Sequence, residues 1–289
     1  KDSLSMCVKD GDRTITSPGT LVISGYAPCP NLYNKVTPNF KEIGRILYLV
    51  HFGKTRMGGS TLYRHFDALG QEPPMLDNPT KLKNLFGVIQ SLISENKILS
   101  LHDRSDGGLI TTLIEMAISS NIGFNITIPY VGYDDIIKYL FNEELGIVIE
   151  INELYKNEIE RKLKNIHVKI DTLGETIFNK RAILYDNTNE VIMNTCLEEL
   201  RNYWEFTSFE IDKKQLVYPH AFNEYSQHIT PIMTHYYLPE HVEIFCVSPY
   251  FINSDINEPP KVAIIREEGS NGDKEMMAAF YYVGCEVYN

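Results

Sequence analysis

The sequence predicts an α/β or α+β fold in which helices pack on a β-sheet. Apolar residues alternate with polar ones at Phe124, Ile126 and Ile128, which is the period of a strand. Between residues 78 and 93, apolar residues instead recur at helical spacing. From residue 98 onward, strand and helix patterns alternate along the chain, which is typical of helices layered on a sheet.

The composition is that of an acidic globular protein. Of the 289 residues, 43% are hydrophobic and 22% are charged, which excludes disordered and collagen-like classes. The length suggests two domains, or one domain with pieces of others. The formal net charge of −11 repels phosphate backbones, so no nucleic-acid binding is predicted. This negative net charge does not exclude a local basic pocket that binds a nucleotide.

Three features together predict a cytoplasmic protein that contacts no membrane. The longest apolar runs, such as 46–50 and 147–149, fall well short of the roughly 20 residues of a membrane span. The first residues are charged and polar, unlike a signal peptide. The five cysteines are scattered without a CxxC pair, which favours reduced thiols over zinc ligands or disulfides.

Both ends of the chain resemble the interior of a longer sequence. The chain begins at Lys1 rather than at a methionine. Its last residues, 284–289, form a strand pattern with nothing after it. We therefore expect a fragment of a longer polypeptide.

The first part of the chain predicts strands and two helices. A turn signal at 16–19 precedes a β-rich run at 21–27. A strand at 45–52 and a glycine turn then lead to a helix at 60–69. The clearest helix begins at Asn78, a suitable N-cap, with Pro79 at the first helical position, where its missing N–H costs nothing.

The middle of the chain alternates between strands and helices. A short apolar segment, 98–101, leads to a helix with Leu109, Leu113 and Ala117 on one face. The other expected elements are strands at 124–128 and 146–151, helices at 133–141 and 154–163, two strands flanking residues 179–180, and a helix within 196–214 whose inner face carries Leu197, Leu200 and Trp204.

The last quarter of the chain differs in composition. Residues 217–259 are rich in Tyr, His and Pro, lack periodicity and are interpreted as a linker. A strand at 261–266, a helix at 274–283 and a strand at 285–288 then predict the opening β-α-β of a separate domain.

The best candidate site runs from residue 102 to 109. Asp103 and Asp106 lie three residues apart on a loop that enters a helix through Gly107-Gly108. Helix N-termini present unpaired N–H groups to phosphates, and Mg2+ prefers one or two carboxylates together with waters and phosphates. Asp103 is therefore a candidate metal ligand over a nucleotide, and Ser105 a candidate donor to a phosphate or base.

For other polar residues we favour a structural interpretation. Asp106 is interpreted as an N-cap, and the glycines after it as residues that the turn requires. A histidine at the end of an apolar strand, such as His102, is more often structural than catalytic. Segment 53–60 lacks the spacing of a Walker loop and is interpreted as a strand-to-helix turn. The pair Glu143-Glu144 is interpreted as a solvated helix end.

The first three residues have two open interpretations. Lys1 can meet a phosphate as a point charge, and Ser3 can donate a hydrogen bond to it. An ordinary solvated loop explains these residues equally well, and the local sequence does not decide between the two.

Taken together, the motifs resemble the large, single-chain form of phosphoribosylformylglycinamidine synthase. The resemblance covers nearly the whole chain in order, except 217–259, and the motifs are specific in combination rather than singly. Segment 260–273 resembles the start of the glutamine amidotransferase domain of these enzymes. The segments that carry the resemblance are 1–6, 16–24, 36–38, 57–60, 69–70, 102–109, 115–117, 141–146 and 260–273.

The resemblance implies an ATP-dependent C–N ligase of purine biosynthesis. Such enzymes convert formylglycinamide ribonucleotide to formylglycinamidine ribonucleotide. ATP phosphorylates the substrate amide oxygen, and ammonia released from glutamine displaces the phosphate. The implied ligands of the full-length enzyme are ATP or ADP, Mg2+, the ribonucleotide and glutamine. The glutaminase residues and the remaining metal ligands are expected outside this chain, so no catalytic residue is assigned and the chain alone is expected to be inactive.

The resemblance also implies a fold and a domain organisation. The fold class is α+β, a PurM C-terminal-like sheet with packed helices, followed by the first β-α-β of an α/β class I amidotransferase domain. Residues 1–43 would end a PurM N-terminal-like domain, and 44–205 would form the C-terminal-like domain. Residues 206–259 would be a linker, and 260–289 a truncated glutamine amidotransferase domain.

Matching motif positions imply site residues. Asp103 resembles a magnesium ligand and Ser105 a nucleotide contact, while Lys1 and Ser3 match a loop near the phosphates or the substrate. In large members this half is associated with an auxiliary nucleotide held with magnesium, and the reacting ATP with the other half. The nucleotide at Asp103 would then have a structural role and would not take part in the reaction.

Two other functions stay open from the sequence. One is another PurM-type ATP-dependent enzyme, such as a relative of selenophosphate synthetase or thiamine-phosphate kinase, against which segment 260–273 argues. The other is a stand-alone, non-catalytic nucleotide-binding domain.

Overall fold

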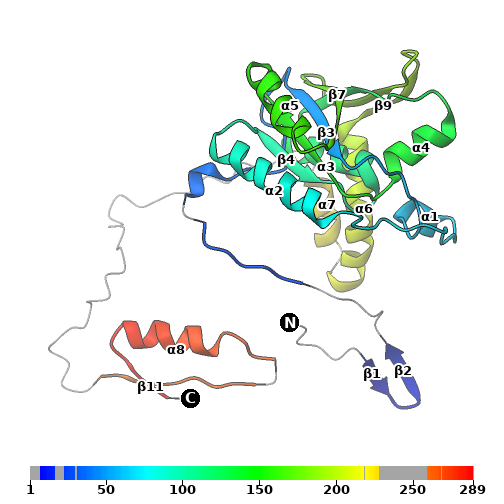
Figure 1. The fold of residues 1–289 in the computed structure, drawn as a ribbon. Helices are drawn as coiled ribbons and strands as arrows, with labels where there is room; N and C mark the ends of the chain where they lie inside the picture. The colour runs from blue at the N-terminus through cyan, green and yellow to red at the C-terminus, as the bar shows by residue number, and fades with distance from the viewer. Residues whose placement is uncertain are drawn as a thin grey trace. The chain divides into compact units, whose positions relative to one another are not determined.

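The computed structural model describes residues 7–16, 23–29, 31–217, 219–227, 259–267 and 269–288. The chain divides into two units, one spanning Cys29–Ile232 and the other combining Lys1–Pro28 with Met233–Asn289. In these described ranges, no helix combines the length and the apolar character needed to cross a membrane. The larger unit carries the main sheet and most of the helices (Figure 1).

The main sheet has seven strands in the order β4-β6-β3-β7-β5-β8-β9. The strands are β3 (Ile46–His51), β4 (Ser100–Asp103), β5 (Gly123–Thr127), β6 (Gly146–Ile151), β7 (Lys169–Ile177), β8 (Arg181–Tyr185) and β9 (Val191–Cys196). Neighbours are antiparallel except β5 and β8, which are parallel. A mainly antiparallel sheet with helices makes the fold α+β, as the resemblance implies.

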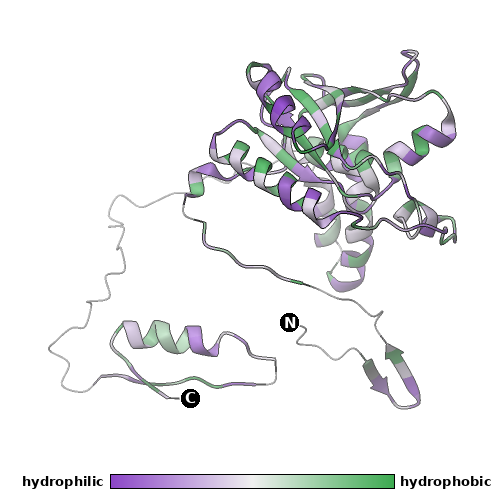
Figure 2. Ribbon diagram, viewed as in Figure 1, coloured by the Kyte–Doolittle hydropathy of each residue, from purple (hydrophilic) through white to green (hydrophobic). Residues whose placement is uncertain are grey.

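The central strand β3 is buried on both faces. Leu47 and Leu49 point into one hydrophobic cluster and Tyr48 and Val50 into a second, because side chains alternate along a strand. All four are 0% exposed. Burying such a side chain stabilises the fold by about 1.5–3 kcal/mol. Figure 2 accordingly shows hydrophobic strands enclosed by helices whose outer faces are hydrophilic.

Helices cover both faces of this sheet. The cluster around Leu47 includes side chains of α3 (Gly108–Ser120), α4 (Tyr133–Phe141) and α6 (Leu197–Gln215). The cluster around Tyr48 includes side chains of α2 (Pro79–Ser94) and α5 (Lys156–Lys164). Both clusters are continuous with the sheet, so the larger unit has three layers.

The start of α2 follows the prediction. Asn78 Oδ1 accepts a hydrogen bond from the backbone N–H of Lys81 at 3.0 Å, and Pro79 occupies the first turn. The helix then buries Leu85 and Ile89 on its inner face. The strands predicted at 45–52, 124–128 and 146–151 and the helices at 133–141 and 154–163 are also present, with bounds shifted by a few residues at most.

Several expected elements differ from the structure. Residues 23–27 form no strand, while 21–22 lie outside the described residues. The helix expected at 60–69 is the short α1 (Thr61–His65), because it buries no residue. Phe66 and Leu69, expected on its packed face, are 70% and 76% exposed. Trp204, expected on the inner face of α6, is 52% exposed.

The sheet also contains pairings that adjacent sequence does not indicate. The strands flanking residues 179–180, β7 and β8, do not pair with each other, because β5 lies between them. The strand β9 was not predicted, since its polar and exposed sequence lacks a clear apolar alternation. The described part of segment 217–259 contains α7 (His220–Gln227), which packs on α6.

The remaining elements are short. They are η1 (Leu32–Asn34) and η2 (Glu153–Tyr155) of the larger unit, and β1 (Cys7–Asp10), β2 (Arg13–Thr16), β10 (Lys261–Ala263), α8 (Asp273–Tyr282) and β11 (Glu286–Tyr288) of the smaller one. Strands β1 and β2 form an antiparallel hairpin, whereas β10 and β11 pair in parallel. With α8 between them, β10 and β11 form a β-α-β arrangement as predicted for the end of the chain, although the strand predicted at 261–266 ends at Ala263.

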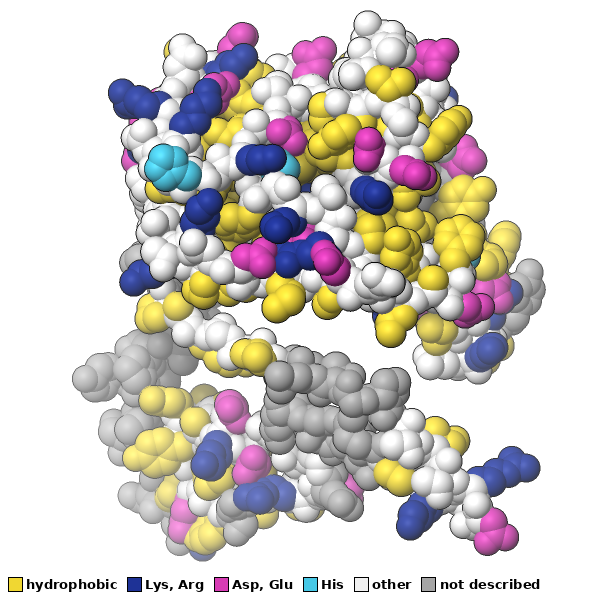
Figure 3. Space-filling view, turned by 45° about the vertical axis from the view of Figure 1, so that its right-hand side comes forward, with side chains coloured by type: hydrophobic (Ala, Val, Ile, Leu, Met, Phe, Trp, Pro, Cys, Tyr) yellow, Lys and Arg dark blue, Asp and Glu magenta, His cyan; other side chains and the backbone are white. Residues whose placement is uncertain are grey.

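The surface of the larger unit mixes charges. On the face presented in Figure 3, basic and acidic side chains lie close to one another and hydrophobic side chains lie between them. That face therefore shows no continuous basic surface of the kind a nucleic-acid backbone requires.

Two glutamates of the loop between α4 and β6 are turned inward. Glu143 Oε1 accepts hydrogen bonds from the backbone N–H groups of Thr61 and Gly107, each at 2.8 Å. Glu144 is 4% exposed and forms an ion pair with Arg56. The interpretation of this pair as a solvated helix end is wrong, because both carboxylates hold other segments in place.

Replacing Glu143 tests this link. Hydrogen bonds to a charged acceptor contribute about 1.5–3 kcal/mol, so Glu143→Ala is expected to accelerate amide hydrogen exchange about tenfold at Thr61 and Gly107. NMR-detected exchange measures both amides in one experiment. Glu143→Gln keeps an oxygen acceptor but loses the charge, so its exchange rates should lie between those of Glu143→Ala and the original protein. Unchanged exchange at both amides in the alanine variant would contradict the link.

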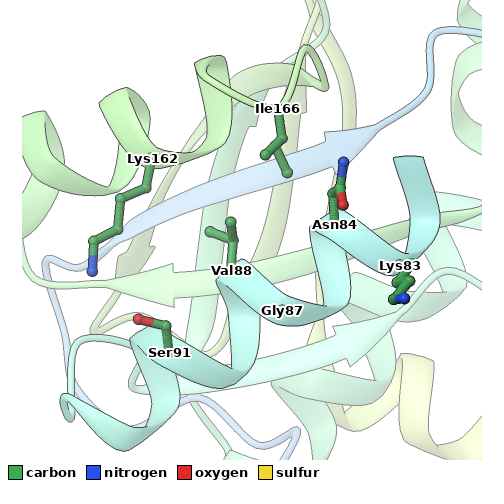
Figure 4. A pocket seen from close by; sticks show the side chains of 7 residues that line it. All are labelled: Lys83, Asn84, Gly87, Val88, Ser91, Lys162 and Ile166. Carbon is green, nitrogen blue, oxygen red and sulfur yellow. The ribbon is translucent and has the colours of Figure 1, made fainter. Parts of the chain in front are cut away.

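Gly87 offers a second test, of helix stability. It lies in the middle of α2 beside a hollow between α2 and α5, whose walls include Val88 and Lys162 (Figure 4). A Cβ built at Gly87 meets no atom within 4 Å. Because glycine costs a helix about 1 kcal/mol relative to alanine, Gly87→Ala should raise the free energy of unfolding by about 0.5–1 kcal/mol.

Chemical denaturation measures this change, and Gly108→Ala provides the matched control. A Cβ at Gly108 would lie 2.6 Å from the carbonyl oxygen of Leu140 at a φ of +74°, so this variant should be less stable than the original protein. A Gly87→Ala variant that is no more stable than the original protein would contradict the prediction.

Candidate functional site

The candidate site lies where the edge strand β4 ends. Asp103 is the last residue of β4, and its side chain is 70% exposed. The Ser105 hydroxyl donates a hydrogen bond to Asp103 Oδ2. This bond holds the pKa of Asp103 below its ordinary value; partial burial opposes the effect and nearby His102 adds to it. Asp103 is therefore an exposed carboxylate that is ionised at neutral pH.

Two glycines form the turn from β4 into α3. Gly107 and Gly108 have φ angles of 81° and 74°. A Cβ at Gly107 would lie 2.2 Å from Thr111 Oγ1, so no other residue fits without displacement. The structural interpretation of the glycines is confirmed. The interpretation of Asp106 as the N-cap is wrong, because Gly107 occupies that position and makes no side-chain hydrogen bond.

The first N–H groups of α3 already have acceptors. The Gly107 N–H donates to Glu143, and the Gly108 N–H donates to the carbonyl oxygen of Ser105 at 3.0 Å. These two N–H groups are therefore not available to a phosphate, contrary to the expectation for this helix N-terminus. The carboxylates of Asp103 and Asp106 are both exposed on this loop, and Asp103 is the one that the Ser105 hydroxyl holds in place.

Arg104 points away from Asp103 into the protein and is 5% exposed. Its Nε donates to the carbonyl oxygen of Glu144 at 2.6 Å, and its backbone N–H donates to the carbonyl oxygen of Gly146 at 2.7 Å. Burial lowers the pKa of Arg104 to about 10, which still leaves it charged at neutral pH. Arg104 thus fixes the site loop to the loop that precedes β6.

His102 lies between two carboxylates. Its Nδ1 is 3.3 Å from Asp103 Oδ1, and its Nε2 is 3.1 Å from Glu115 Oε2. The second oxygen of Glu115 accepts a hydrogen bond from the indole N–H of Trp204 at 3.2 Å. These contacts link β4, α3 and α6. The sequence did not indicate the contacts of Glu115, because its partners lie 13 and 89 residues away along the chain.

An open cavity of about 410 Å³ adjoins these contacts. Its lining residues come from α3, α6, β4 and the segment before β3. They are Pro38, His102, Glu115, Ile118, Ser119, Arg201, Trp204 and Glu205. Arg201 donates a hydrogen bond to the carbonyl oxygen of Ile118, which fastens α6 to the end of α3.

The turn formed by residues 53–60 contains no phosphate cradle of the Walker type. The Gly58 N–H donates to the carbonyl oxygen of Glu72 at 2.8 Å, and Ser60 Oγ accepts from the backbone N–H of Tyr63 at 3.3 Å. Ser60 thereby caps α1, and the interpretation as a strand-to-helix turn is confirmed.

The donor set at the site suits one kind of cation. In the described ranges, no three His, Cys, Asp or Glu side chains converge as they would around a metal coordinated by protein alone. Mg2+ keeps several waters and binds phosphate oxygens, so a site with one exposed carboxylate suits Mg2+ better than zinc, which takes three or four protein ligands. Lys1 and Ser3, the other candidate site residues, lie outside the described residues.

The chain matches proteins of known families. Residues 43–186 match the family model described as AIR synthase related protein, C-terminal domain. Over its whole length the chain is 37% identical to phosphoribosylformylglycinamidine synthase of Homo sapiens, of which it covers 22%. It is 36% identical to the probable phosphoribosylformylglycinamidine synthase, chloroplastic/mitochondrial, of Arabidopsis thaliana, of which it covers 20%. The chain thus spans about a fifth of the length of these relatives.

A solved structure shares the fold. The structure described as T. maritima PurL complexed with FGAR superposes with a TM-score of 0.50 at 13% identity, over 58% of this chain and 30% of that chain. At this identity the likeness concerns the fold alone, and it agrees with the α+β architecture described above. The whole-chain sequence matches and the domain at residues 43–186 thus make the chain similar to the phosphoribosylformylglycinamidine synthases.

Proposed function

We propose that the chain is part of an ATP-dependent, glutamine-using ligase that converts formylglycinamide ribonucleotide to formylglycinamidine ribonucleotide in purine biosynthesis. The observation that carries this proposal is the identity of 36–37% along the whole chain to synthases of that name. It favours the ligase over another PurM-type enzyme and over a stand-alone nucleotide-binding domain. We place the ligase in the cytoplasm.

The proposed domain organisation follows the sequence boundaries. The family match at 43–186 supports a PurM C-terminal-like domain at 44–205. Residues 1–43 would complete a PurM N-terminal-like domain and 206–259 would connect to the next domain. The parallel pairing of β10 and β11 around α8 supports the start of a class I glutamine amidotransferase domain at 260–289. Glutamine would bind to the complete form of that domain.

In this proposal Asp103 holds Mg2+ beside the phosphates of ATP or ADP. The exposure of its carboxylate, its lowered pKa and the absence of a competing ion pair with Lys or Arg at this carboxylate among the described contacts all support the role. Ser105 would contact the nucleotide and also orient Asp103 through its hydroxyl. For Lys1 and Ser3, the proposed nucleotide contact rests on the resemblance of their motif. Bound Mg2+ would neutralise phosphate charge here.

Mutation of Asp103 tests the cation site. Asp103→Ala removes the proposed metal-ligating carboxylate, so Mg2+-dependent binding of ATP or ADP by the intact protein should weaken at least about tenfold. Isothermal titration with and without Mg2+ measures the effect. Asp106→Ala is the matched control, because Asp106 is an exposed carboxylate three residues away and should leave binding unchanged. Equal affinity of Asp103→Ala and the original protein would refute the assignment.

Ser105→Ala tests the origin of the lowered pKa. Without the hydroxyl, the pKa of Asp103 should rise toward its ordinary value of 3.8, because the largest cause of its depression is gone. Mg2+-dependent nucleotide binding should then be lost at a higher pH on acidification than in the original protein. Identical pH dependence of binding in the two proteins would show that the hydroxyl does not set this pKa.

The ligase itself is tested on the intact polypeptide. Full-length protein should convert formylglycinamide ribonucleotide to formylglycinamidine ribonucleotide in a reaction that requires both ATP and glutamine. Chromatography of the product measures the conversion. Failure to form product would contradict the proposed function. The isolated 289-residue chain should release no ammonia from glutamine, and steady glutaminase activity of that chain would contradict the proposed division of the protein into domains.

A further inference from the structure

We propose that His102 and Glu115 are positioning residues that orient Asp103 and transmit cation binding at Asp103 to α6 through Trp204. The inference rests on the proposed function, because it assumes that Asp103 binds Mg2+ with a nucleotide. It adds a coupling between this site and α6, which contacts α3 through Trp204 and Glu115.

The coupling runs through three consecutive polar contacts. His102 Nδ1 lies 3.3 Å from Asp103 Oδ1, and His102 Nε2 lies 3.1 Å from Glu115 Oε2. Glu115 Oε1 accepts the indole N–H of Trp204 at 3.2 Å. Both oxygens of Glu115 and both ring nitrogens of His102 are engaged, so a rotation of one side chain disturbs the next.

The Asp103 end of this series is the part that a cation would change. Oδ2 accepts the Ser105 hydroxyl and Oδ1 faces His102, so the two neighbours fix the plane of the carboxylate. A cation that binds Oδ1 competes with His102 for the same oxygen. His102 then relies more strongly on Glu115, and the bond from Glu115 to Trp204 changes in response.

The Trp204 end is suited to respond. Among the described residues of α6, Leu197 is fully buried and Leu200 packs against the core partly buried, whereas Trp204 is 52% exposed. Two polar contacts fasten it to α3: Trp204 to Glu115, and Arg201 to the carbonyl oxygen of Ile118. Both line the cavity beside His102, which leaves room for the indole to move.

Tryptophan fluorescence provides the test. Trp204 is the single tryptophan of the 289 residues, and the difference between the intact protein and its Trp204→Phe variant isolates its emission in a longer polypeptide. Saturating Mg2+ with ATP should shift or quench this emission, whereas ATP in the presence of a chelator should not. Calorimetry on the same samples measures binding independently of the fluorescence.

Two variants test whether the series positions Asp103. Removing a partner that orients a metal ligand typically weakens metal binding about tenfold or more, so Glu115→Ala should weaken Mg2+-dependent nucleotide binding by that factor and abolish the response of Trp204. Trp204→Phe keeps an aromatic ring but removes the five-membered ring with its indole N–H, and calorimetry should show binding about threefold weaker. The Phe variant keeps the test decisive if Glu115→Ala fails to fold.

Ser119→Ala is the matched control. Ser119 lies on α3 and lines the same cavity, but its hydroxyl donates to the carbonyl oxygen of Met116 and takes no part in the series. This variant should keep both the affinity and the fluorescence response.

The outcomes separate the inference from the function on which it rests. Binding that depends on Asp103 without any change in Trp204 emission would overturn the coupling and leave the cation site intact. A response of Trp204 that persists in Glu115→Ala would overturn the route through Glu115. Absence of Mg2+-dependent nucleotide binding in the intact protein would overturn the proposed function of the site, and the inference with it.

Discussion

The burial of β3 on both faces is the constraint on which the larger unit depends. Leu49 and Val50, adjacent in sequence, enter hydrophobic clusters on opposite sides of the sheet, so neither face can meet water. Helices must therefore cover both faces, and α3 is part of one cover. Because α3 starts directly after β4, the layer that buries Leu49 also fixes the loop that carries Asp103.

Buried charges refine what the hydrophobic layers position. Arg104 and Glu144 lie inside the protein, where each is bound by partners from another segment. A buried charge that loses its partner costs about 3–5 kcal/mol, so these contacts hold the loops in one arrangement. Glu143 adds a carboxylate between the turns at Thr61 and Gly107. Asp103 is the contrasting case, since the residues around it are bound to other segments while its own carboxylate faces solvent.

The sequence predicted the elements whose signals are local. The Asn78 cap, the apolar strand 146–151 and the helix at 133–141 depend on neighbouring residues, and the structure contains all three. Signals that depend on distant packing were missed: Trp204 has helical spacing with Leu197 and yet lies exposed on α6. The same distinction between local signals and distant packing applies to the site. The position of Asp103 and Ser105 on one loop was evident from spacing, whereas the contacts of Glu115 and Glu143 arise from residues brought together by the fold.

The pairing of β3 also determines when this unit can assemble during synthesis. Its hydrogen-bonding neighbours, β6 and β7, emerge on the order of 100 residues later in the chain. At ribosomal rates of roughly 5–20 residues per second, the apolar strand waits for about 5–20 seconds before it can pair. Such distant pairing slows folding and leaves an aggregation-prone segment unprotected. The nascent chain would therefore be a natural client for chaperones until the strand at Gly146–Ile151 has left the ribosome.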